Sequence, residues 1–172
     1  MKRSELNPKE YNVYYQTYLS LVDGDTDLID GLLESGEKAR MFLQSLSEEQ
    51  FEHSYADGKW TVKEIVQHII DTERIFSARA LRFARNDKTI LSGYDHNVYA
   101  QASNAGDRTK ESLLDEYKAL RNATIALFRS FSDIMLNRMG NANQNDISVR
   151  SIGFILIGHE NHHIKIIKER YL

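Results

Sequence analysis

The chain has 172 residues, a formal net charge of −3, and 41% hydrophobic against 27% charged residues. This is the balance of an ordinary globular protein that can bury a core without disulfides or a structural metal. The basic residues are spread along the chain, which argues against nucleic-acid binding, and the lack of cysteine excludes thiolate metal ligands and a thiol nucleophile. The sequence contains neither a signal-peptide pattern nor a membrane-spanning stretch. We therefore expect one cytoplasmic domain, 1–172, in which any metal is held by nitrogen and oxygen.

The predicted elements begin with a Tyr-rich lead-in at 1–25, where Pro8 suits the first turn of a short helix. Apolar residues at helical spacing then predict four long helices. We place these helices at about 26–45, 61–85, 110–130 and 148–171.

The second helix opens with a capping-box pattern, in which Thr61 and Glu64 satisfy backbone N–H groups. The stretch 86–109 is rich in Asn, Asp, Ser and Gly and has no sustained period, so it is expected to be a long connection. No β-alternation is found. The fold class expected is all-α, a four-helix bundle with a long crossover between helices two and three.

The fourth helix contains GHENHHIKIIKERYL, which places three histidines and a glutamate within five positions. At about 100° per residue, His159 and His163 lie in the middle of the apolar stripe, whereas His162 lies at its edge. Two imidazoles on a core face need partners for their ring nitrogens, and an i, i+4 pair can present two of them to one metal ion. The alternative is that both rings hydrogen-bond to carbonyls or carboxylates of neighbouring helices. The stacked pair favours the metal.

The same residues satisfy the zinc-protease motif HExxH, with Glu160 in the place of the general base. The nine residues after His163 contain no further histidine, and the extended form of the motif fails at Ile166 and Glu169. No strand is predicted that could align a peptide substrate. A protease is therefore disfavoured.

A third ligand is expected from the second helix, where His68 lies at the border of the apolar arc, close to Glu64 and Asp71 by helical spacing. Structural zinc normally fills all four positions with protein ligands, so three imidazoles with an open position indicate a catalytic type of site. Taken alone, His68 would be better explained as a solvated rim residue. The pair in the fourth helix makes it the leading third ligand.

Two segments, YADGKWTVKEIVQHIIDTERIFSARALRFARND (55–87) and SVRSIGFILIGHENHHIKIIKERYL (148–172), resemble the DinB-like superfamily, also called DinB/YfiT, and its DinB_2 branch. Members are four-helix-bundle metalloproteins with one histidine in a Trp-led second helix and HxxxH or HxxHH in the fourth. The resemblance implies that His68, His159 and His163 are metal ligands. Characterised members include metal-dependent thiol transferases that use bacillithiol or mycothiol and a mycothiol-dependent maleylpyruvate isomerase. Many others have no established substrate and are labelled metal-dependent hydrolases.

We expect one divalent ion, with zinc first and nickel, iron or manganese also suited to three nitrogens plus water. Such a centre supports a small-molecule hydrolase or a transferase with a low-molecular-weight thiol cosubstrate, because it activates water or binds a thiol as thiolate. The rival function is a non-enzymatic metal- or ligand-binding stress-response protein.

Other residues are expected around the metal ligands. Asp71 and Glu160 are candidate catalytic proton carriers, although both could be solvated surface carboxylates, and His162 and Glu64 are expected beside the ligands or at the rim. The long connection could cover the site and contact substrate through four side chains, Tyr94, Asp95, His96 and Tyr99. Surplus aromatic residues predict a homodimer.

Overall fold

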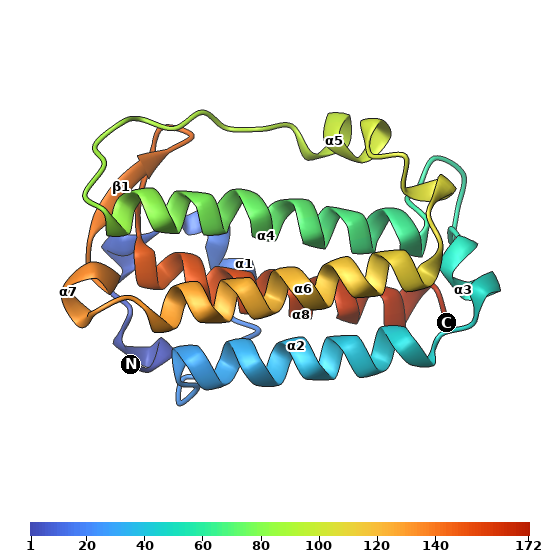
Figure 1. Cartoon of the computed structure of the whole chain (residues 1–172), viewed down its shortest axis with the longest axis horizontal. Coiled ribbons are helices and arrows are strands. Elements are labelled where there is room, and N and C mark those ends of the chain that lie inside the picture. The colour runs from blue at the N-terminus through green and yellow to red at the C-terminus, as the bar shows by residue number, and fades with distance from the viewer.

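Four long helices form the body of the computed structural model, which describes all residues from 1 to 172 (Figure 1). They are α2 (Leu28–Ser45), α4 (Val62–Ala84), α6 (Lys110–Arg129) and α8 (Val149–Arg170). Each begins after a polar residue whose side chain accepts a backbone N–H of the first turn, and the capping box of Thr61 and Glu64 is formed. The four predicted helices are confirmed to within one turn at each end. None of the helices is both long and apolar enough to cross a bilayer.

The four helices pack so that α2 and α4 lie diagonally opposite each other, each against both α6 and α8. The colours of Figure 1 show that α2 and α8 run in one direction while α4 and α6 run in the other. Because α4 and α6 are parallel neighbours, the chain between them must return along the length of the bundle. The connection 85–109 does this and contains α5 (His96–Ala102) and the 3₁₀ turn η4 (Ala105–Asp107). The predicted crossover is confirmed.

The N-terminal segment lies against α8 and forms one wall of the cavity described below. It contains short helical turns, η1 (Arg3–Glu5), η2 (Pro8–Glu10), η3 (Val13–Tyr15) and α1 (Gln16–Leu19). Pro8 starts a 3₁₀ turn capped by Asn7, in keeping with its predicted role. A Cβ at Gly158 would collide with the carbonyl oxygen of Tyr18, so the glycine allows α1 to approach α8 closely.

A two-stranded antiparallel hairpin, β1 (Met139–Ala142) and β2 (Asn145–Ser148), joins α7 (Asp133–Leu136) to α8. No strand is expected from the sequence, so the hairpin is a correction, although a minor one in a helical fold. Its turn residues Asn143 and Gln144 have φ values of 52° and 62°, the left-handed conformation that a tight hairpin needs at both positions. The strands were missed because their pattern is too polar to show alternation.

The bundle core consists of two apolar clusters, one toward each end of the molecule. The first contains Phe76, Phe83, Phe128 and Phe154, and the second contains Phe51, which lies in α3 (Glu48–Glu52). Where the four long helices pass from one cluster to the other, each contributes a buried polar residue. These residues are Ser35, Glu73, Arg121 and Glu160. The middle of the bundle is therefore polar, and the histidines lie at this level.

Candidate metal centre

Three histidines converge between α4 and α8. His68 comes from α4, while His159 and His163 lie one turn apart on α8. The Nε2 atom of His159 is 3.1 Å from the Nε2 atom of His68 and 3.1 Å from that of His163. One ring nitrogen from each of the three residues lies within 4.8 Å of the others. The two helices that the sequence singled out thus bring their ring nitrogens to one point.

Aromatic neighbours hold the histidine rings in place. Trp60, just before α4, lies with its ring centroid 5.0 Å from that of His68. Tyr18 of α1 packs edge-on against His159 at 5.3 Å and against His162 at 5.4 Å. The ring positions are therefore fixed by packing from two segments outside the long helices.

All three imidazoles are held in the neutral form. Burial lowers the pKa of His68 to about 4, and burial also lowers the pKa values of His159 and His163 well below their usual range. Neighbouring imidazoles add to this effect, because each would repel a second positive charge. Neutral imidazole is the form that binds a metal ion.

The nitrogen cluster fits a metal ion better than it fits a hydrogen-bond network. None of the three rings hydrogen-bonds to a carbonyl or carboxylate of a neighbouring helix. A neutral Nε2 carries either one proton or one lone pair, so the central nitrogen of His159 cannot make good hydrogen bonds to both neighbours. In tetrahedral coordination with bonds of 2.0–2.1 Å, ligand nitrogens lie about 3.3 Å apart, close to the 3.1 Å separations here.

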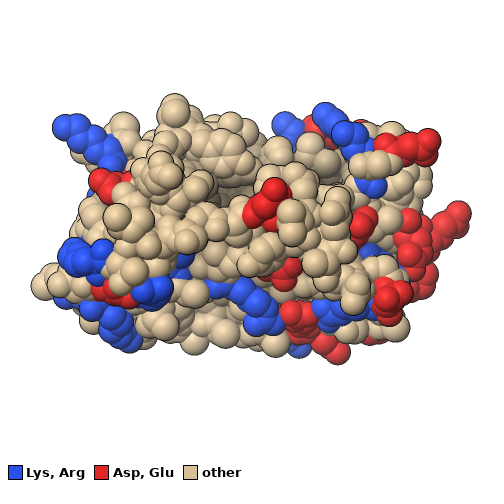
Figure 2. Space-filling model, turned by 90° about the horizontal axis from the view of Figure 1, so that it is seen from above, with Lys and Arg blue, Asp and Glu red and all other residues tan.

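The histidines face a cavity of about 370 Å³ that opens between the bundle, the N-terminal segment and the connection. Its wall is largely aromatic, with polar groups placed among the rings. Besides the three histidines, its lining residues include Tyr14, Tyr18, Trp60, Thr72, Phe76, Arg79, Tyr94 and His96. No aspartate or glutamate lines it. Figure 2, which looks onto the connection, shows most charged side chains toward the ends and the lower edge of this face, with a few acidic ones near its middle.

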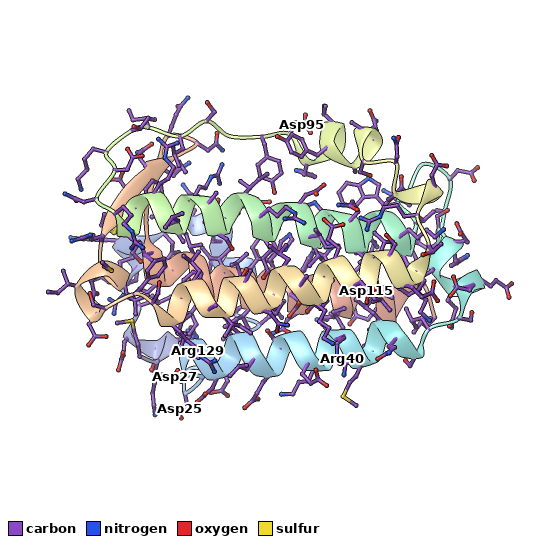
Figure 3. All side chains as sticks on the ribbon, viewed as in Figure 1. Asp25, Asp27, Arg40, Asp95, Asp115 and Arg129 are labelled. Carbon is purple, nitrogen blue, oxygen red and sulfur yellow. The ribbon has the colours of Figure 1, made fainter.

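Two of the four residues of the connection that were predicted to contact substrate line the cavity. Tyr94 and His96 line the cavity, and the His96 ring lies 5.8 Å from the His68 ring. Asp95 instead caps α5 by accepting the backbone N–H groups of Asn97 and Val98, at the outer edge of the molecule in Figure 3. Tyr99 packs against Tyr94 with ring centroids 5.2 Å apart and is not in the cavity wall. The structure thus leaves Asp95 and Tyr99 outside the cavity.

Glu160 points away from the histidines into the middle of the bundle. Its side chain is 1% exposed and accepts hydrogen bonds from the Tyr117 hydroxyl and from Arg121, the latter at 2.8 and 3.1 Å. The same guanidinium also binds Glu73 at 2.8 Å. The carboxylate that follows His159 in sequence is therefore not brought to the cavity, because the residues are about 100° apart on α8.

The remaining predicted residues surround the site without entering its cavity. Asp71 is half-buried on α4 and accepts a hydrogen bond from Gln67 at 2.9 Å, and burial raises its pKa. Glu64 is occupied by the capping box at the start of α4. His162 is half-buried, packs against Tyr18 and the ring of His163, and is not in the cavity wall.

Several cavity residues had not been singled out from the sequence as site residues. Tyr14, Tyr15 and Tyr18 come from the Tyr-rich lead-in, where the clustering of aromatic residues was the only available signal. Arg79 lies three turns after His68 in α4, on the same helical face. Helical spacing from His68 could have found Arg79, whereas the lead-in could be placed only by the fold.

A four-helix bundle that gathers one histidine from its second long helix and two from its fourth defines the class of this protein. Residues 32–167 match the family model of the DinB superfamily. The chain therefore belongs to the DinB superfamily, which confirms the resemblance drawn from its sequence.

One relative within this class has a known fold. The chain is 22% identical over 143 residues to YfiT of Bacillus subtilis (strain 168), covering 82% of this chain and 80% of the relative, whose name assigns it provisionally to the metal-dependent hydrolases. The solved structure of YfiT superposes with a TM-score of 0.74, covering 83% of this chain and 82% of that one. That structure is described as an unusual four-helix bundle topology. The shared fold confirms the predicted bundle.

Proposed function

We propose that the protein is a metal-dependent hydrolase of small molecules, with His68, His159 and His163 as the ligands of one divalent ion. The observation that carries this proposal is the convergence of three neutral Nε2 atoms, with two separations of 3.1 Å, at the wall of a cavity of about 370 Å³. The provisional name of the YfiT relative agrees in class. With three imidazoles as its protein ligands, such an ion would leave a position open for water and would polarise a substrate oxygen, and zinc would lower the pKa of the water to about 7.

The protein's own groups divide the remaining work. The three imidazoles stay neutral through burial and so remain available as ligands near neutral pH. The aromatic wall formed by Tyr18, Trp60 and the neighbouring rings excludes bulk water from the centre. Because no carboxylate lines the cavity, the imidazole of His96 is the lining group suited to carry a proton during the reaction.

The ligand assignment is tested by elemental analysis of protein purified without a nickel column. We expect one divalent ion per chain in the wild type and little in His163→Ala, with His53→Ala as a control because His53 is exposed and lies outside the cavity. Added zinc should raise the melting temperature of wild type and His53→Ala but not of His163→Ala, because only a bound ligand stabilises the folded state. Equal metal content in His163→Ala and wild type would refute the ligand set.

Turnover is tested with chromogenic esters and amides on wild type and on His159→Ala compared at matched metal loading. Hydrolysis lost in the variant supports the proposal. Product that forms only when a low-molecular-weight thiol and an electrophile are both supplied would favour a thiol transferase at the same centre. Binding without product above a metal-only control would favour a non-enzymatic binding protein.

A further inference from the structure

The cavity contains a buried positive charge that the protein itself does not balance. Three cationic side chains are buried, those of Lys63, Arg79 and Arg121. Lys63 pairs with Glu52, and Arg121 with Glu73 and Glu160. Arg79 pairs with no carboxylate, although it is only 7% exposed. No nitrogen of Arg79 is among the buried atoms that lack a hydrogen-bond partner, so its unpaired nitrogens are accessible from the cavity, and a counter-charge can reach them from outside the chain.

The guanidinium of Arg79 is held in place, yet most of its hydrogen-bonding capacity is free. Its one hydrogen bond runs from Nη2 to the carbonyl oxygen of Ser92, at 2.9 Å. The guanidinium carbon lies 5.1 Å from the ring centre of Phe76 and 6.0 Å from that of Tyr94. The Tyr94 hydroxyl is in turn 2.8 Å from the Thr72 hydroxyl. The remaining N–H groups of the fork have no acceptor in the protein and are available to a ligand.

Arg79 belongs to the same cavity as the histidines but to its other end. Both His68 and Arg79 line it, and their spacing places them on one face of α4. A rise of 1.5 Å per residue separates their Cα atoms by about 16 Å, and the long side chain of Arg79 leans toward the N-terminus of α4, the end at which His68 lies. One cavity therefore connects the guanidinium to the histidines.

We infer that the cavity takes a small molecule bearing an oxyanion, a carboxylate or a phosphate, and that Arg79 binds this group while the reacting end lies at the histidines. The identification of this molecule as a substrate rests on the proposed function, whereas the binding of an oxyanion does not. The planar guanidinium fork matches both oxyanions in a bidentate fashion. Since no acidic residue lines the cavity, no carboxylate of the protein contacts an anion bound there.

The test is calorimetric binding of glutarate, of inorganic phosphate and of glutaramide, the neutral analogue of glutarate, to the full chain. We expect at least one of the two anions to bind wild type roughly 10-fold or more tightly than glutaramide, and Arg79→Gln to lose that preference. Tighter binding of glutarate would identify a carboxylate ligand, and tighter binding of phosphate a phosphate ligand. Equal affinities for anions and glutaramide, or an unchanged Arg79→Gln, would overturn the inference.

Two controls separate anion binding from other effects. Arg74→Gln removes an exposed arginine of the same helix that pairs with Glu116 outside the cavity, so it should bind the anions as wild type does. Arg79→Lys keeps the charge without the fork, and it should bind the anions with intermediate affinity and carries the test if Arg79→Gln does not fold. If Arg79 only anchors the connection through Ser92, its variants will melt at lower temperature with unchanged anion preference, which would also overturn the inference.

His163→Ala separates this inference from the proposed function. Because Arg79 lies at the other end of the cavity, metal-depleted His163→Ala should still prefer the anion over glutaramide. Retained preference in a protein without turnover would support the anion subsite even if the hydrolase proposal fails. Loss of the preference in His163→Ala, with Arg79→Gln unaffected, would show that the anion binds at the histidine centre and would overturn the role of Arg79.

Discussion

His159 and Glu160 are neighbours in sequence but belong to two buried polar clusters with opposite properties. Around Glu160 every charged group has a partner inside the protein, since Arg121 binds both Glu160 and Glu73, and Tyr117 donates to Glu160. Around His159 the ring nitrogens approach one another to 3.1 Å, and none of them finds a carbonyl or carboxylate. The polar groups of the first cluster find their partners within the protein, whereas the ring nitrogens of the second are free to bind a ligand.

The two clusters differ in the helices that they join and in whether their polar groups have partners. The Arg121 cluster joins α4, α6 and α8, and Arg121 also donates to Leu32 and Ser35 of α2. It therefore links all four long helices where the two apolar clusters meet. The histidine cluster joins only α4 and α8 and borders a cavity. A buried cluster whose polar groups all have hydrogen-bond partners indicates a role in the fold. A cluster of ring nitrogens that converge beside a cavity without such partners indicates a role in binding.

The largest expected effect follows from breaking the Arg121 cluster. Arg121→Met leaves the carboxylates of Glu73 and Glu160 buried without a cation, which should lower the free energy of unfolding by about 3–5 kcal/mol. Urea denaturation measures this loss. Lys38→Met serves as the control, because the exposed Lys38–Glu34 pair on α2 should contribute no more than about 0.5 kcal/mol. A loss in Arg121→Met as small as that of the control would mean that this cluster does not hold the bundle together.

A smaller effect on stability is expected from replacing Glu160, the neighbour of His159 on α8. Glu160→Gln keeps the shape of the side chain but removes its charge, and should cost about 1–3 kcal/mol of unfolding free energy while metal content stays at the wild-type level. His159→Ala should lose the metal. Elemental analysis and urea denaturation of both variants measure the two properties. Loss of metal in a folded Glu160→Gln would place Glu160 in the metal centre and blur the division between the clusters.

The smallest effect, counted per pH unit, is a pH dependence of stability to which the histidine cluster contributes. Burial lowers the pKa of His68 to about 4, so as pH falls below about 6.5 the unfolded chain takes up a proton that the folded state refuses. Stability of the metal-free protein should therefore fall between about pH 6.5 and 4, by at most about 1.4 kcal/mol per pH unit for this imidazole. Urea denaturation at several pH values should give a shallower slope for His68→Gln than for wild type or His53→Gln. Equal slopes for all three proteins would contradict the pKa assignment.

Local sequence signals predicted the helices and the histidine pair well. The long helices follow from apolar spacing and polar caps such as Thr61 and Ser148, which act within a few residues of themselves. The spacing of His159 and His163 places both rings on one helical face without any tertiary information. The hairpin escaped prediction because its polar strands gain their order from contacts, including the backbone hydrogen bonds between Leu91 and the residues Asn141 and Asn143.

Local signals in the sequence fix the long helices, the long connection between the second and third of them, and the placement of His159 and His163 on one face of α8, because periodicity and capping act within a few residues. Only the tertiary structure decided which polar residues share a neighbourhood. It turned Glu160 toward Arg121, brought Tyr18 against His159, and left Arg79 in the cavity without a counter-charge. The physical reason is that the partner of a buried polar group is chosen by helix packing between segments far apart in the chain, and a single sequence carries no local signal for that choice.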